Sequence, residues 1–258
     1  MEGAIQLNII QFCLVYLLLI IIIFIMKRSN INQTKLLIVS SFRMTVQLVL
    51  AGLILTYILQ YPNPIFTMIY LMVMIIFSIY YVLSKNKELN KKFKLVVALS
   101  LFSTGLFIVC FFIMVIVGID IFNPQYTIPL AGMIVGNSMT GVTLALKVFK
   151  EEIQSQKLKI DSLLNLGVKP SHVLNPIANN SLETAIIPTI NSMVGMGIIF
   201  LPGMMTGQIL SGTPPFTSIL YQIAIMIAIC AAVCLAVFCS LNFGYKTLYN
   251  ERNQISLD

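Results

Sequence analysis

The sequence has few charged residues and long stretches that carry none. Only 10% of the 258 residues are Asp, Glu, Lys or Arg, whereas 58% are hydrophobic and the mean hydropathy is +0.94. A soluble core of this length cannot hide so much apolar side chain, so the composition excludes an ordinary soluble globular protein. The long apolar stretches instead predict a chain that spans a membrane.

The sequence also lacks the groups that several catalytic sites need. It contains no G-x-x-x-x-G-K-[ST] motif, so it cannot bind ATP through a P-loop of its own. Ser138 lies between glycines in GNSMTG, like an exposed nucleophile, but the one histidine, His172, falls in a different segment. A serine without a neighbouring base is a poor nucleophile, which argues against a hydrolase. We therefore expect no enzymatic activity in this chain and no cofactor bound by it.

No carboxylate or histidine lies inside an apolar run except near its end. A cage of carboxylates and imidazoles for a hard metal ion is thus missing, and proton coupling through a membrane-embedded carboxylate has no visible candidate. The five cysteines lie in or beside apolar runs and indicate packing rather than a disulfide framework. Cys230 and Cys234 share a helix face, but two thiols without His or carboxylate are a poor metal site.

Seven long apolar runs are present. Most are near the ~20 residues that an α-helix needs to cross a ~30 Å hydrocarbon layer. The runs are Leu7–Met26, Leu36–Ile58, Ile65–Leu83, Leu95–Val117, Tyr126–Leu146, Ala185–Leu201 and Phe216–Phe238. We therefore predict an all-α integral membrane protein with seven transmembrane helices in a single domain, residues 1–258.

Basic residues occur in alternate gaps between these runs. Fifteen of the sixteen Lys and Arg residues lie in the first, third and fifth gaps and in the C-terminal tail, and the other gaps hold none. Because basic loops stay in the cytoplasm, this pattern predicts an outside N-terminus and a cytoplasmic C-terminus. The basic residues then set the orientation of the chain in the membrane and contact anionic lipid, which explains the net charge of +7. Nucleic acid is therefore not an expected partner.

One sizeable segment, residues 150–184, lies outside the membrane on the predicted cytoplasmic side, between the fifth and sixth helices. Apolar residues recur at helical spacing from Ile153 to Leu166, with polar residues between them. Gly167 is expected to end this helix, and Pro170 is expected to begin another.

Pro176 and the Asn179-Asn180 pair are expected to mark a further turn in the same segment. We thus predict two short helices that meet at a corner, residues 161–176. Such a corner is too small for an enzyme domain and has the right size to dock on a partner.

Polar side chains are concentrated in the second, fifth and sixth predicted helices. A polar group that faces lipid stays unpaired, so we expect these helices, either alone or together with the seventh, to form the inner layer of the protein. The candidates for a path across the membrane are Arg43, Gln47, Asn137, Ser138, Asn191, Ser192, Met204, Met205 and Gln208.

Arg43 is the only charged residue well inside an apolar run. An arginine at mid-membrane costs about 3 kcal/mol on insertion scales, and less when the side chain reaches toward the interface. Two interpretations stay open: an arginine that extends to the inner end of its helix, or a buried base that pairs with a carbonyl or an acid in the path.

The sixth predicted helix, taken with the residues that follow its apolar run (186–212), contains two prolines, Pro188 and Pro202. Each lacks a backbone donor, so we predict that the helix is kinked or interrupted and that the prolines act as hinges. Interrupted helices in membranes line cavities. Several methionines lie on the fifth and sixth helices; their thioethers suit Cu(I) and are poor ligands for Fe or Mn, but Met also fills gaps in packing. Any metal ligands are left unassigned.

Several strings in the sequence resemble one family. They are LNLGVKPSHV (164–173), PTINSMVGMGIIFLPGMMTGQILSGTPPFTSILYQIAIM (188–226), PLAGMIVGNSM (129–139) and RMTVQL (43–48). These are similar to the bacterial iron-export ABC permeases of the FetB type, a family with a plant branch tied to aluminium tolerance. The similarity extends from the second predicted helix to the seventh.

The resemblance implies a multi-pass permease of the cell (inner) membrane that exports iron or another metal, or its complex. Two copies would pair above two copies of a separate cytosolic ATPase, and that partner would hold ATP and Mg. An ion-gradient-driven secondary transporter and a permease for a non-metal substrate are the alternatives.

The resemblance also implies a coupling helix in the corner. ABC permeases often dock on the ATPase through an E-A-A-x-x-x-G pattern. Residues 161–167 keep its spacing, with Asp161 for Glu, no alanines and no I-x-L-P continuation. The residues expected to couple to the ATPase are Asp161, Leu164, Gly167, Pro170 and His172.

Overall fold

The computed structural model describes residues 8–249, and almost all of them are helical. In chain order the helices are α1 (Ile9–Val15), α2 (Leu17–Arg28), α3 (Thr34–Gln60), α4 (Pro64–Lys85), α5 (Lys91–Phe111), a π-helical turn η1 (Phe112–Val117), α6 (Pro124–Ser155), α7 (Lys157–Asn165), α8 (Pro170–Gly195), α9 (Gly203–Leu210), α10 (Pro215–Gly244) and a 3-10 turn η2 (Tyr245–Thr247). The all-α prediction is confirmed. Leu7, the first residue of the first apolar run, and Arg252, one of the basic residues of the C-terminal tail, lie outside the described residues.

Six helical segments within residues 8–249 are long and apolar enough to cross a membrane. They are Gln11–Arg28, Thr34–Gln60, Pro64–Lys85, Lys91–Val117, Pro124–Ser155 and Pro215–Thr247. The sixth predicted run, Ala185–Leu201, is not among them, because α8 ends at Gly195 and the helix resumes only at Gly203. Seven continuous spans are therefore not confirmed, whereas the predicted interruption of this helix is present.

Asparagine caps define where three of the long helices begin. Asn63 accepts a hydrogen bond from the backbone N–H of Ile65 at 2.9 Å, and Asn123 accepts one from Gln125 at 3.1 Å. Asn90 does the same for Phe93 at 2.6 Å. These side chains satisfy donors that the first turn of a helix leaves free, so α4, α5 and α6 start where the apolar runs begin.

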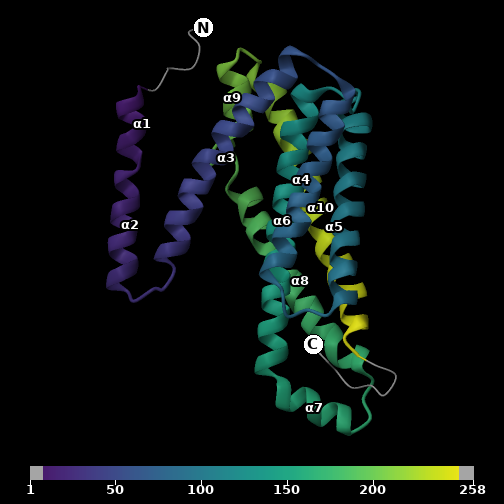
Figure 1. Cartoon of the computed structure of the whole chain (residues 1–258). Helices are drawn as coiled ribbons and strands as arrows, with labels where there is room; N and C mark the ends of the chain where they lie inside the picture. The colour runs from purple at the N-terminus through teal and green to yellow at the C-terminus, as the bar shows by residue number, and fades with distance from the viewer. Residues whose placement is uncertain (1–7, 250–258) are drawn as a thin grey trace.

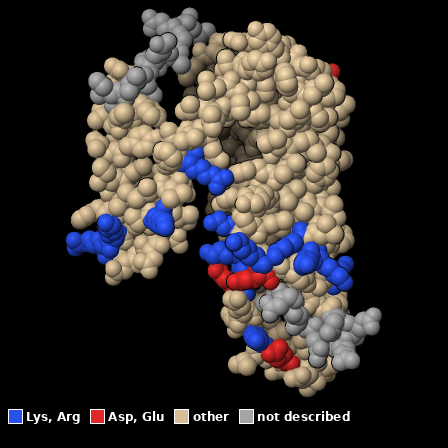
Figure 2. All heavy atoms as spheres, viewed as in Figure 1, with Lys and Arg blue, Asp and Glu red and all other residues tan. Residues whose placement is uncertain are grey.

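The core lies between α4, α5, α6, α8 and α10, which pack side by side in Figure 1. α6 contacts α4, α5, α8 and α10, so it occupies the centre of this bundle, and α10 contacts α5, α6 and α8. Small residues allow the close approach: the α-carbon of Gly141 on α6 faces Val233 of α10, and that of Gly244 faces the fully buried ring of Phe93 on α5. The loops that carry the basic residues lie at one end of the bundle (Figure 2).

α1, α2 and α3 form an arm that stands beside the bundle (Figure 1). No residue of α2 is buried, and on α3 only Ile58 is. The prediction that this second long helix belongs to the inner layer is therefore wrong for the single chain. Two of its hydroxyl groups bond within the helix: Thr45 donates to the carbonyl of Ser41 at 3.0 Å, and Thr56 donates to that of Gly52 at 2.8 Å. The Thr45 hydroxyl also lies 2.5 Å from the hydroxyl of Tyr16, which connects α3 to the start of the arm.

The contact between Gly244 and Phe93 yields a test of the packing. A Cβ at position 244 would lie 2.6 Å from the Phe93 ring, and a buried ring has no room to shift. We expect Gly244→Ala to lower the stability by about 1–3 kcal/mol. Gly136→Ala is the matched control, since a Cβ there meets no atom within 4 Å. Thermal unfolding in detergent micelles, followed by size-exclusion chromatography, should give a lower midpoint for Gly244→Ala alone; equal midpoints would contradict this account.

Candidate functional site

The corner forms at the basic end of the bundle, where α6 continues past its apolar part and turns into α7. Gly167 ends α7 with a positive φ of 83°. Its N–H donates to the carbonyl of Leu164 at 2.9 Å, and the N–H of Val168 donates to that of Leu163 at 3.1 Å. This pair of bonds is a Schellman motif, which favours glycine at the left-handed position. α8 then begins at Pro170, so the predicted end of one helix at Gly167 and the predicted start of the next at Pro170 are confirmed.

The further turn predicted at Pro176 and Asn179-Asn180 is wrong. α8 runs without a break from Pro170 to Gly195, through Pro176 and through Pro188. Each proline removes one backbone hydrogen bond, but the residues that follow Pro176 are buried against α6 and hold the helix together. The corner is thus made by one short helix and one helix of 26 residues.

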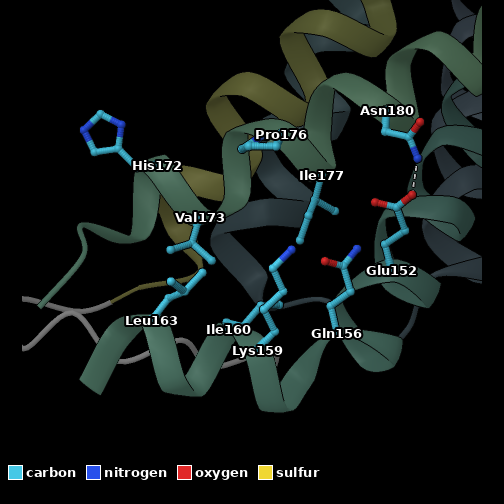
Figure 3. A pocket seen from close by; sticks show the side chains of 10 residues that line it. All are labelled: Glu152, Gln156, Lys159, Ile160, Leu163, His172, Val173, Pro176, Ile177 and Asn180. Carbon is cyan, nitrogen blue, oxygen red and sulfur yellow. Dashed lines mark hydrogen bonds between the residues drawn. The ribbon is translucent and has the colours of Figure 1, made fainter. Parts of the chain in front are cut away.

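Apolar side chains attach α7 to the bundle. Ile160 is buried, Leu163 is half-buried, and Figure 3 shows Leu163 facing Val173 of α8. Together with polar residues they enclose a cavity of about 310 Å³. Its remaining lining residues are Glu152, Gln156, Lys159, His172, Pro176, Ile177 and Asn180. At the rim, the amide of Asn180 donates to the carboxylate of Glu152, which ties α8 directly to α6 (Figure 3).

The outer face of α7 combines apolar and polar side chains. Leu158 is 86% exposed and Leu166 is 80% exposed, although both are apolar. Asp161 is exposed on the same helix, and His172 is exposed at the start of α8. Leu164 is half-buried and Pro170 is buried, so these two predicted coupling residues support the corner from within. The sequence analysis did not identify Leu158 and Leu166 as exposed residues. It could have done so, because the apolar residues of α7 cover more than one face of the helix and cannot all pack against the bundle.

An ion pair connects the corner region to the loop between α4 and α5. The ammonium of Lys150 on α6 lies 2.7 Å from the carboxylate of Glu88. The hydrogen bond and the charge of Lys150 lower the pKa of Glu88 below its ordinary value. Because Glu88 is exposed, the pair adds little stability, but it fixes α6 beside the loop at neutral pH.

A second cavity lies where the sixth predicted helix is interrupted. It has a volume of about 440 Å³ and lies between the end of α8, the break, α9 and α10. Its lining residues are Met193, Met196, Gly197, Leu201, Pro202, Met205, Ile219, Gln222, Ile223, Met226 and Ile227. Pro202 is the N-cap of α9, so the interruption falls at this proline and not at Pro188. The structure therefore bears out the expectation that an interrupted helix lines a cavity.

Two residues of α10 in this cavity were missed by the sequence analysis. Gln222 is buried, and its Oε1 accepts no hydrogen bond from any described residue. Met226 is buried beside it, one helical turn further along. The sequence could have singled out Gln222, because it is the only amide within the run Phe216–Phe238.

The predicted path residues of α8 and α9 lie in or near the break. Met205 is buried and lines the cavity, whereas Met204 is half-buried. Gln208 is half-buried, and its Oε1 accepts no hydrogen bond within residues 8–249. Asn191 is exposed, and Ser192 donates to the carbonyl of Pro188 at 2.9 Å. Of these residues, only Met205 lines the cavity.

The remaining predicted path residues, on α3 and α6, do not line the second cavity. Asn137 is exposed and donates to the carbonyl of Met133 at 2.7 Å, and buried Ser138 donates to that of Ile134 at 2.9 Å. Each side chain thus makes its one hydrogen bond within α6. Arg43 and Gln47 are exposed on α3, where the guanidinium of Arg43 lies 5.4 Å from the ring centroid of Phe77. A cation–π contact at this distance partly compensates the charge.

Comparison with known proteins identifies the relatives of this chain. The profile of the uncharacterised protein family UPF0014 matches residues 9–249. The UPF0014 membrane protein slr1647 of Synechocystis is 30% identical over 90% of this chain and 90% of its own length. The "Probable iron export permease protein FetB" of Escherichia coli is 26% identical over 94% of this chain and 92% of its own length.

A plant relative matches a shorter part of the chain. The "Protein ALUMINUM SENSITIVE 3" of Arabidopsis thaliana is 35% identical over 45% of this chain and 42% of its own length. No solved structure matches the sequence significantly. The resemblance noted from the sequence strings is confirmed by these matches. With its apolar helices and a family profile that covers nearly all described residues, this chain is a multi-pass membrane protein and belongs to the UPF0014 family.

Proposed function

We propose that this chain, as a single permease domain, is the transmembrane subunit of an ATP-driven ABC exporter. The observation that carries the proposal is the corner: a short helix at the basic end of the bundle, closed by a glycine cap, that presents two exposed leucines. The printed name of the Escherichia coli relative supports a permease role. The chain itself supplies no catalytic chemistry, and a separate cytosolic ATPase supplies ATP and Mg.

The surface of α7 suits a protein partner better than water or lipid. Leu158 and Leu166, with 86% and 80% of their surface exposed, are large apolar side chains among charged and amide groups. Such a mixture is typical of a docking surface, where apolar anchors enter a pocket and polar groups form a rim. Asp161, which takes the place of Glu in the E-A-A-x-x-x-G spacing, and His172 provide that polar rim. The basic end faces the cytoplasm, where the ATPase is found.

Movement of the corner has a direct route to the second cavity. α7 is attached to α8 through Leu163 and Val173, and α8 continues as one helix to the break at Gly195. ATP binding closes the ATPase pair, displaces α7 and shifts α8 relative to α6. Pro188 and Pro202 act as hinges, so the cavity alternates between inward and outward access. ATP must bind one of these states more tightly, because otherwise it would shift no population.

The assembly consists of two copies of this chain and two ATPase subunits in the cell (inner) membrane, with the N-terminus outside. One such chain supplies half of an ABC pathway. The cargo is iron, another metal or a metal complex. No membrane-embedded carboxylate is present for proton coupling, which makes an ion-gradient-driven transporter the weaker alternative.

Co-purification tests the docking surface. The wild-type chain, solubilised from its native membrane, should retain an ABC ATPase subunit. Leu158→Glu with Leu166→Glu should lose that subunit, because the apolar anchors become charged. Ile31→Glu is the matched control, since Ile31 is also exposed (45%) and lies in the α2–α3 loop at the same basic end. A wild-type chain that moves cargo without any ATPase would exclude the ABC assignment.

Substitution of Gly167 tests whether the corner transmits the movement of the ATPase to the membrane part. Gly167→Val places a β-branched residue at φ of 83°, in open space, so it strains the corner by about 1–2 kcal/mol without a clash in the membrane part. We expect the complex still to assemble and the thermal midpoint to fall by only a few degrees, in line with this strain. Metal export per ATP hydrolysed in proteoliposomes should fall about tenfold.

Gly118→Val controls for backbone strain alone. Gly118 has a φ of 73°, is equally uncrowded and lies at the other end of α6. This variant should keep normal coupling. If both variants lose export equally, or if Gly167→Val retains full coupling, the corner does not transmit the force.

A further inference from the structure

The second cavity is rich in sulfur. Four of its eleven lining residues are methionines, whereas methionine accounts for 14 of the 258 residues of the chain. Met193 comes from the end of α8, Met196 from the break, Met205 from α9 and Met226 from α10. Residues up to 33 positions apart in the sequence therefore bring thioethers to one space. Packing alone requires no such concentration of one side chain.

Gln222 adds an oxygen to this group of sulfurs. Its Nε2 lies 3.6 Å from Sδ of Met196, so at least one thioether is turned toward the amide. The side chain is 95% buried, and its Oε1 accepts no hydrogen bond within the described part of the chain. A buried carbonyl oxygen without a donor costs about 1–3 kcal/mol. An apolar cargo would leave this oxygen unpaired, whereas a cation would satisfy it.

We propose that the second cavity binds a soft monovalent cation of the Cu(I) class. Thioethers are soft ligands, and Cu(I) is the biological metal that they suit; Fe(II) prefers imidazole and carboxylate. The described residues contain no group of three or more His, Cys, Asp or Glu side chains that could hold a metal ion. The four thioethers coordinate the cation, and the Gln222 oxygen faces its charge.

Further soft donors continue from the cavity along α10. Met226, Cys230 and Cys234 follow one another at four-residue spacing on the same helix, and both thiols are half-buried. Neighbours at this spacing lie about 6 Å apart along a helix axis. The two cysteines, which are too few to form a site alone, thus extend the sulfur-rich surface toward the basic end of α10. A cation released from the thioethers has soft partners within one helical turn.

Binding of Ag(I) to the purified chain tests this site. Ag(I) has the charge and softness of Cu(I) and requires no reductant. The five cysteines are changed to alanine in every sample, because thiols bind Ag(I) strongly and would mask the thioethers. The starting protein should bind one Ag(I) by isothermal titration in detergent. Changing Met193, Met196, Met205 and Met226 together to leucine should weaken the affinity about a hundredfold or more.

A matched control separates the cavity from methionine content. Changing Met44, Met68, Met72 and Met114 to leucine removes the same number of thioethers, none of which lines the cavity. This control should bind Ag(I) as the starting protein does. Leu and Met have similar volumes, so both variants should fold and elute alike. If the cavity variant fails to fold, Met196→Leu and Gln222→Leu alone should still weaken binding about tenfold.

Three outcomes would overturn the proposal: no Ag(I) binding, equal loss in the cavity and control variants, or tighter binding of Fe(II) than of Ag(I). As a statement about cargo, the inference rests on the proposed exporter and narrows its cargo to a soft monovalent cation. The Ag(I) titration itself needs no ATPase, so it tests the site independently. A chain that binds Ag(I) and retains no ATPase would keep this site and refute the exporter. A chain that retains the ATPase but does not bind Ag(I) would refute the site and keep the exporter.

Discussion

Backbone groups inside a membrane must find partners within the protein, and this constraint decides where the chain can be irregular. At the break between α8 and α9, the N–H of Gly197 donates to the carbonyl of Phe200 at 3.0 Å, and the N–H of Ile199 donates to that of Gly195 at 2.9 Å. The break is thus a compact turn that satisfies much of its own backbone. Because it does so, the helix can stop at Gly195, resume at Gly203 and leave room for a cavity.

The corner and the cavity are the two ends of one helix. α8 has 26 residues, so it extends about 39 Å and carries the corner at one end and the break at the other. Between them Ile177, Ala178, Ser181 and Ala185 are buried, and the Asn180–Glu152 hydrogen bond adds a polar tie to α6. The arrangement connects a surface suited to a protein partner with a space suited to a small cargo. No flexible linker separates them.

Local signals in the sequence predicted the parts of this structure that depend on local chemistry. Hydropathy identified the six long helices, Gly167 and Pro170 defined the corner, and Pro202, directly after the sixth run, indicated its interruption. Tertiary packing decided the rest. Pro176 stays within α8 because its neighbours are buried. α3 lies outside the core of the single chain, and of its residues only Ile58 is buried. The convergence of Gln222 with four methionines depends on three helices meeting, which no single segment encodes.

The length of α3 has a consequence for the arm. Its 27 residues extend about 40 Å, which exceeds the ~30 Å hydrocarbon thickness of a typical bilayer. A helix with so few buried residues can relieve this hydrophobic mismatch by tilting, and Figure 1 shows α3 inclined to the bundle. The inclination therefore follows lipid composition: longer acyl chains bring α3 closer to upright, and shorter ones lay it over. The lateral outline of the protein thus varies with the lipid around it.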